Sequence, residues 1–178
     1  MYPWGHLAVG YLCYSLGVRL WNQRPPAGVA MVPLAIGTQF PDLVDKPLSW
    51  TFDILPSGRS LGHSILVALV IALTLWYAGR KFDRRTEAVA FFSGYLLHII
   101  ADMSPFVVSG EWKKLGSVLW PLVPAYQYPG ESDRTIIEFL SAIDLTSVPA
   151  EAFVLIILTV SLWMYDELPG ADILFNED

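Results

Sequence analysis

One short stretch of the chain carries two residues that together can bind a metal ion. Residues 94–103 have the sequence GYLLHIIADM, in which His98 and Asp102 stand four positions apart among apolar residues. On a helix, this spacing puts both side chains on one face, one turn apart. An imidazole and a carboxylate so placed can share one divalent cation. A hydrogen-bonded His–Asp pair without a metal is the alternative that the spacing leaves open.

Other polar residues stand near the ends of further apolar segments. The chain has three histidines, of which His6 begins the first segment and His63 begins the third, while Asp42 follows the second. If the segments cross a membrane in alternating directions, all of these residues fall on the side where His98 and Asp102 lie. Their convergence favours a metal site, although helix capping by His63 and a turn at Asp42 remain open.

Five apolar segments must position these residues. The third is 18 residues long without an acidic or basic side chain, and at 1.5 Å per residue it reaches roughly 27 Å, close to the hydrocarbon thickness of a bilayer. We predict an all-α fold, a polytopic membrane helical bundle of about four to five transmembrane segments in a single domain over residues 1–178. The segments are approximately 5–21, 28–40, 61–78, 87–108 and 149–164.

The overall composition supports a membrane protein and excludes other classes. The 178 residues are 54% hydrophobic and only 16% charged, whereas soluble domains have about a quarter charged residues. The net charge of −6 argues against nucleic acid as a partner, because binding phosphates requires basic side chains. One cysteine excludes an internal disulfide and a cysteine-rich zinc cluster. Membrane lipids are the expected surroundings.

The distribution of basic residues predicts the topology. Short cytoplasmic loops are enriched in lysine and arginine. Six basic residues cluster at two short turns, which we therefore place in the cytoplasm: Arg19, Arg24, Arg80, Lys81, Arg84 and Arg85. We expect a multi-pass protein of the cytoplasmic (inner) membrane, with the metal site at the extracytoplasmic face.

Several motifs, taken in order, resemble a known family. They are similar to those of the YdjM-like integral membrane metal-dependent hydrolases, archaeal members in particular, over roughly residues 4–124. A more distant resemblance is to zinc-dependent phospholipase C and the fungal single-strand nucleases, which implies a helical core of their kind. The motifs are GHLAVGYL, IGTQFPDLVDKP, GRSLGHS, GYLLHIIADMSP and LWPL.

The resemblance implies a particular set of metal ligands. A first metal would be held by Asp42, His63, His98 and Asp102, and Asp102 would bridge to a second metal that His6 also contacts. Zinc is the expected ion, in one or two copies.

The chain departs from the family pattern at two positions. Lys46 stands where the family commonly has histidine, and Gly58 replaces the first histidine of the family's HRGFTHS motif. Both changes remove ligands for an additional metal.

Two further residues are candidates for catalytic roles. Arg59 lies four residues before His63 and could bind a substrate phosphate or carboxylate, or instead extend to lipid headgroups. Asp45 could orient a ligand histidine or cap a loop.

The predicted function is a membrane-embedded metal-dependent hydrolase that acts on a phosphodiester or a related ester, with a lipid or lipid-linked substrate favoured by its location. Two alternatives remain. One is a non-catalytic protein with a structural metal site or a partner-binding role. The other is a small transporter, against which the nearly apolar third segment argues.

Overall fold

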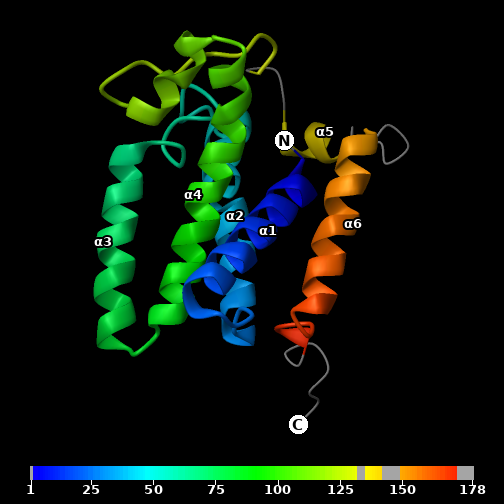
Figure 1. Ribbon diagram of the computed structural model, residues 1–178. Coiled ribbons are helices and arrows are strands. Elements are labelled where there is room, and N and C mark those ends of the chain that lie inside the picture. Colours follow the sequence, from blue (N-terminus) through cyan, green and yellow to red (C-terminus); the bar gives the residue numbers. More distant parts are fainter. Residues whose placement is uncertain (1, 132–134, 142–148, 172–178) are drawn as a thin grey trace. The chain divides into compact units, whose positions relative to one another are not determined.

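The computed structural model describes residues 2–131, 135–141 and 149–171, and these residues form helices and connecting loops without a strand. The predicted all-α class is therefore confirmed. In chain order the elements are α1 (Pro3–Asn22), η1 (Gly28–Ala30), α2 (Met31–Lys46), η2 (Pro47–Thr51), α3 (Ile65–Lys81), α4 (Arg85–Val108), η3 (Trp112–Leu119), α5 (Ile136–Ser141) and α6 (Ala150–Tyr165), as Figure 1 shows.

The chain divides into two compact units. The first contains Met1–Gln39, Ala72–Ala101 and Pro149–Asp178, and the second contains Phe40–Ile71 and Asp102–Val148. The divisions fall inside α2, α3 and α4, so each of these helices contributes residues to both units.

In the first unit, α1 packs beside α6, as can be followed in Figure 1. The buried core next to this contact includes Tyr11, Tyr14 and Leu34. Glycine permits a close approach of α2 and α4, because a Cβ added at Gly94 would lie 2.5 Å from the carbonyl oxygen of Leu34. Small residues at helix contacts are the usual way for membrane helices to pack backbone against backbone.

A buried carboxylate at the C-terminal end of α6 forms hydrogen bonds with α1. Asp166, 2% exposed, accepts hydrogen bonds from the Tyr11 hydroxyl at 2.6 Å, the Ser15 hydroxyl at 2.5 Å and Arg19 Nε at 2.6 Å. The three donors are spaced four residues apart, so they form one row along α1. We name these four residues the Asp166 cluster.

In the second unit, Glu131 forms hydrogen bonds with the segment that precedes α3. Its carboxylate accepts hydrogen bonds from Trp50 Nε1 at 3.2 Å, Ser57 Oγ at 3.0 Å and the Gly58 backbone N–H at 2.9 Å. A Cβ added at Gly58 would come within 2.7 Å of Glu131 Oε1. The carboxylate therefore occupies the space beside Gly58 that a side chain at this position would need.

The predicted count of four to five transmembrane segments is not supported. Among the described residues, α4 is the one helix that is long and apolar enough to cross a membrane, by length and composition. In the third apolar segment, helix α3 begins only at Ile65, so the first residues of the predicted segment are not helical. The helix has 17 residues and ends in Arg80 and Lys81. The last segment forms α6, an apolar helix of 16 residues.

Candidate metal centre

Four buried side chains form a group that can hold a metal ion. Each offers one ligand atom, and these atoms all lie within 4.8 Å of one another. The exposed fraction of each residue is 9% or less. The group consists of Asp42, His63, His98 and Asp102, the same four residues that the family resemblance assigns to a first metal.

Two helices and one loop supply these ligands. Asp42 lies on α2 directly after Pro41, and His63 lies in the last turn of the loop that precedes α3. His98 and Asp102 lie on α4, where the continuous helix keeps them one turn apart as their spacing predicts. The residue before His63 passes close to α2, and it is glycine: a Cβ added at Gly62 would lie 2.9 Å from backbone atoms of Pro41.

Asp45 fixes the orientation of His63. Its buried carboxylate lies 2.8 Å from His63 Nδ1, and it also accepts the backbone N–H groups of Ser60 at 2.7 Å and Gly62 at 2.6 Å. One carboxylate therefore holds both the loop and the imidazole. A histidine whose Nδ1 hydrogen-bonds a carboxylate presents Nε2 as its ligand atom, which is the usual arrangement at zinc sites.

The distances from His63 Nε2 fit metal coordination better than hydrogen bonding. This atom lies 4.0 Å from Asp42 Oδ1 and 3.8 Å from Asp102 Oδ2, and both distances are too long for a hydrogen bond. Two ligands that each lie at most about 2.2 Å from one zinc ion can be up to about 4.4 Å apart. The donor set and its spacing thus suit a divalent cation.

His98 is oriented by the backbone of α2. Its Nδ1 lies 2.7 Å from the carbonyl oxygen of Thr38, so Nε2 is the ring nitrogen that it offers as a ligand. His6, predicted to contact a second metal, is not in the four-residue group. Its ring, 1% exposed, stacks on the ring of His98 with the centroids 3.8 Å apart. The second metal stays a prediction.

Two basic side chains lie against the carboxylates of this group. Arg59 Nε bonds Asp102 Oδ2 at 2.7 Å, and Lys46 Nζ bonds Asp42 Oδ2 at 2.5 Å. Burial disfavours the charge of the guanidinium, but the neighbouring Asp102 carboxylate outweighs this and raises the pKa of Arg59. Arg59 keeps 22% of its side chain exposed, whereas Asp102 keeps 2%. Arg59 is therefore the more exposed partner of this buried ion pair.

Three further residues that shape the centre were not predicted from the sequence. Tyr128 lies under the guanidinium of Arg59, 5.0 Å from its ring centroid, and burial raises the pKa of its hydroxyl. Glu131 holds the loop that carries Arg59. Thr38 acts through its backbone carbonyl, which any residue type has, so no sequence signal could have identified it.

The comparisons with known proteins give one match. The family described as YdjM inner membrane protein matches residues 1–168, nearly the whole chain. No curated protein and no solved structure matches the chain.

Proposed function

The chain belongs to the YdjM inner membrane protein family, and we propose that it is a membrane-embedded, metal-dependent hydrolase of a phosphodiester or related ester in a lipid. The observation that carries this proposal is that both histidines of the centre are held through Nδ1, one by Asp45 and one by the Thr38 carbonyl. A histidine in an ordinary protein core does not need a dedicated group that orients its ring toward buried aspartates, and here both histidines have one.

The residues that would hold the metal are Asp42, His63, His98 and Asp102. Nitrogen and carboxylate ligands suit zinc, and the ion when bound lowers the pKa of water to about 7 and polarises an acceptor oxygen. Elemental analysis of the purified protein would identify the metal and give the number of ions bound per chain.

Arg59 is proposed to bind the substrate anion. Its Nε is fixed by Asp102 and its plane by the Tyr128 ring, so its conformation is set before substrate arrives. A guanidinium held in this way can direct its remaining N–H groups to a phosphate in a bidentate manner. Its partial exposure supports this role over a purely structural ion pair.

Asp45 is proposed as a positioning residue rather than a proton carrier. Its carboxylate contacts the backbone N–H groups of Ser60 and Gly62 and the Nδ1 atom of His63, and its side chain is fully buried. It therefore acts on the reaction through the orientation of His63.

We further propose that the chain crosses the membrane several times, with the centre at the extracytoplasmic face. Large apolar side chains are exposed along α3 and α6, which supports lipid around both helices. Single cysteines placed at residue 83 and at residue 110, in a chain whose exposed Cys13 is replaced by serine, test this. A membrane-impermeant maleimide should label position 110 in intact cells and not position 83, and the reverse pattern would invert the topology.

The activity itself is tested with the purified full chain in detergent. Hydrolysis of bis(4-nitrophenyl) phosphate and of phosphatidylglycerol would be measured with and without a chelator, beside Asp102→Asn and Arg59→Gln. We expect the chelator and Asp102→Asn to abolish turnover, and Arg59→Gln to raise KM while metal stays bound. Turnover that survives both the chelator and Asp102→Asn would contradict the proposal.

A structural metal site is the second candidate. It is favoured by the count of four protein ligands, because structural zinc sites are closed by four ligands and catalytic ones keep a position for water. Metal at one equivalent that stabilises the fold, with no hydrolysis of either substrate, would support this function instead.

A further inference from the structure

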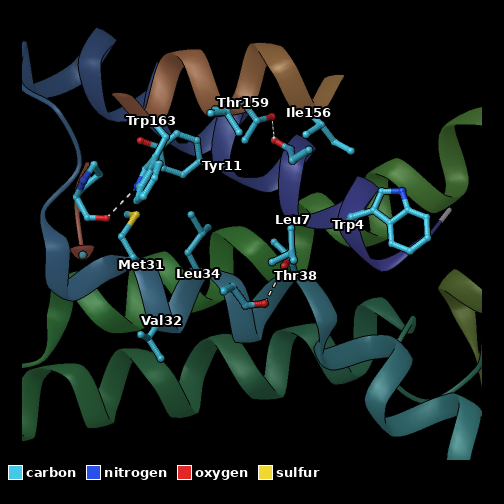
Figure 2. Close-up of a pocket in the computed structure, with 15 residues that line it drawn as sticks. Trp4, Leu7, Tyr11, Met31, Val32, Leu34, Thr38, Ile156, Thr159 and Trp163 are labelled. Carbon is cyan, nitrogen blue, oxygen red and sulfur yellow. Dashed lines mark hydrogen bonds between the residues drawn. The ribbon is translucent and has the colours of Figure 1, made fainter. Parts of the chain in front are cut away.

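An apolar cavity lies in the first compact unit, bordered by α1, α2 and α6 (Figure 2). Its volume is about 500 Å³, which is within the range of small-molecule binding sites. Apolar side chains make up most of its wall, among them Leu7, Met31, Leu34 and Ile156.

The cavity offers almost no hydrogen-bonding groups to a ligand. Five of the lining side chains carry a nitrogen or oxygen atom, and four of these atoms are bonded within the protein at 2.6 to 3.1 Å. The four are those of Tyr11, Thr38, Thr159 and Trp163. A polar ligand would lose its hydrogen bonds to water here without replacement, whereas a hydrocarbon chain would not. The lining thus selects for an apolar occupant.

One end of the cavity is bordered by Thr38, the residue whose backbone orients His98. The side chain of Thr38 borders the cavity, while its carbonyl oxygen bonds His98 Nδ1 at 2.7 Å. Trp4 lies at this end in Figure 2, away from Met31 and Trp163. Tryptophan has an apolar body and one N–H donor, so it suits a boundary between polar and apolar surroundings.

The cavity also has a lateral opening to the apolar exterior. Val32 and Val160 line it, yet they are 49% and 47% exposed. In a protein of an inner membrane family, the molecules next to such residues are membrane lipids. A lipid chain could therefore enter from the side without crossing water.

We propose that this cavity binds one acyl chain of the lipid substrate, with the chain running from Thr38 toward Met31. The proposal rests on the proposed hydrolase function, since it places the scissile ester at the Thr38 end, on the side of His98. Met31 and Thr38 are seven positions apart on α2, a length of roughly 10 Å along the helix. The metal centre would recognise the headgroup ester and the cavity would select for a long hydrocarbon tail.

The test uses the full chain in nanodiscs of phosphatidylglycerol that carries a diazirine near the end of one acyl chain. After irradiation, peptide mass spectrometry locates the crosslinks. We expect them at Met31 and Trp163, and we expect Ala35→Phe and Val160→Trp, which fill the cavity, to reduce them at least fivefold. The matched controls Ile36→Phe and Leu158→Trp lie on the same helices but outside the cavity and should leave the crosslinks unchanged.

Two results would overturn this proposal. One is labelling spread evenly over exposed residues such as Leu73 and Trp76 of α3, insensitive to the filling variants. The other is a crosslink map that lacks the residues lining the cavity.

The same variants separate this proposal from the hydrolase itself. His98→Ala should abolish metal binding and turnover but retain the crosslinks. In the active protein, Ala35→Phe should raise KM severalfold for phosphatidylglycerol and leave hydrolysis of bis(4-nitrophenyl) phosphate unchanged. An active chain whose crosslinks and KM both ignore the filling variants would disprove the acyl-chain site while leaving the hydrolase intact.

Discussion

Two buried polar clusters in this chain use similar groups but balance their charges differently. In the Asp166 cluster, one carboxylate faces one guanidinium, and two hydroxyls donate to the same oxygen. At the metal centre, among the described residues, three buried carboxylates lie beside the basic side chains of Lys46 and Arg59 and the imidazole of His63. The first cluster pairs its charges one to one, whereas the second brings several carboxylates together with two imidazoles that are oriented through Nδ1.

The difference shows how a buried carboxylate can be assigned a role. Asp166 takes all its donors from a single row of α1 and joins two helices. Asp42 and Asp102 instead direct oxygens toward His63 Nε2 at distances beyond a hydrogen bond. Ligand atoms from separate helices and a loop that converge at such distances suit a cation, whereas a carboxylate that takes all its donors from one helix suits a structural role.

Removing a ligand should have the largest effect. His98→Ala is expected to weaken zinc binding more than about 100-fold, since loss of an outer partner alone weakens it 10- to 100-fold. Competition with a chromophoric chelator measures the affinity, and circular dichroism checks that the helices remain. Asp53→Asn, in an exposed part of the loop, serves as the control. An unchanged zinc affinity in His98→Ala would show that His98 is not a metal ligand.

Breaking the orientation of His63 should come next. Asp45→Asn replaces one acceptor oxygen by a donor, which then opposes the Ser60 N–H or His63 Nδ1. We expect zinc affinity to fall roughly 10- to 100-fold. If instead Asp45→Asn binds zinc as tightly as Asp53→Asn, the positioning role of Asp45 is wrong.

The Asp166 cluster should respond in stability and not in metal binding. Asp166→Asn removes the charge that faces Arg19, and hydrogen bonds to charged groups contribute about 1.5–3 kcal/mol. We expect the free energy of unfolding in detergent to drop by about 1.5 kcal/mol, with metal content unchanged. Glu167→Gln, at the exposed neighbouring position, should change neither quantity. Loss of bound metal in Asp166→Asn would show that the Asp166 cluster also supports the metal centre, contrary to this prediction.

The smallest effect is expected at Lys46. Its ammonium lies on Asp42 and repels a nearby cation, so Lys46→Gln should strengthen zinc binding roughly threefold at low salt. The gain should shrink at high ionic strength, because salt screens charges near the surface. Titrations at two salt concentrations test this, and weaker binding in the variant would mean that Lys46 supports the conformation of Asp42.

Part of the centre could be predicted because its signals are local. The His98–Asp102 spacing fixes two ligands on one face of α4 whatever surrounds the helix. The ordered motifs added Asp42 and His63, and those four residues come together as the resemblance implied. The helical class followed from long apolar segments with few charges.

Other features could not be predicted, because they depend on contacts between distant residues. The Thr38 carbonyl that orients His98 has no side-chain signature, and the Glu131 carboxylate that occupies the space beside Gly58 is 73 residues away. The loop before α3 is held by hydrogen bonds to Asp45 and Glu131, and α3 begins only after this loop, at Ile65. Hydropathy alone does not predict such hydrogen bonds.

The helical, apolar character of the chain and the side chains that can bind a metal follow from the amino-acid sequence, because residue type and helical period are local properties. The ring nitrogen that each histidine presents, and the place where the apolar cavity meets Thr38, follow from the packed structure. Those features are distances between separate helices and loops, and distances of that kind exist only after the chain has packed.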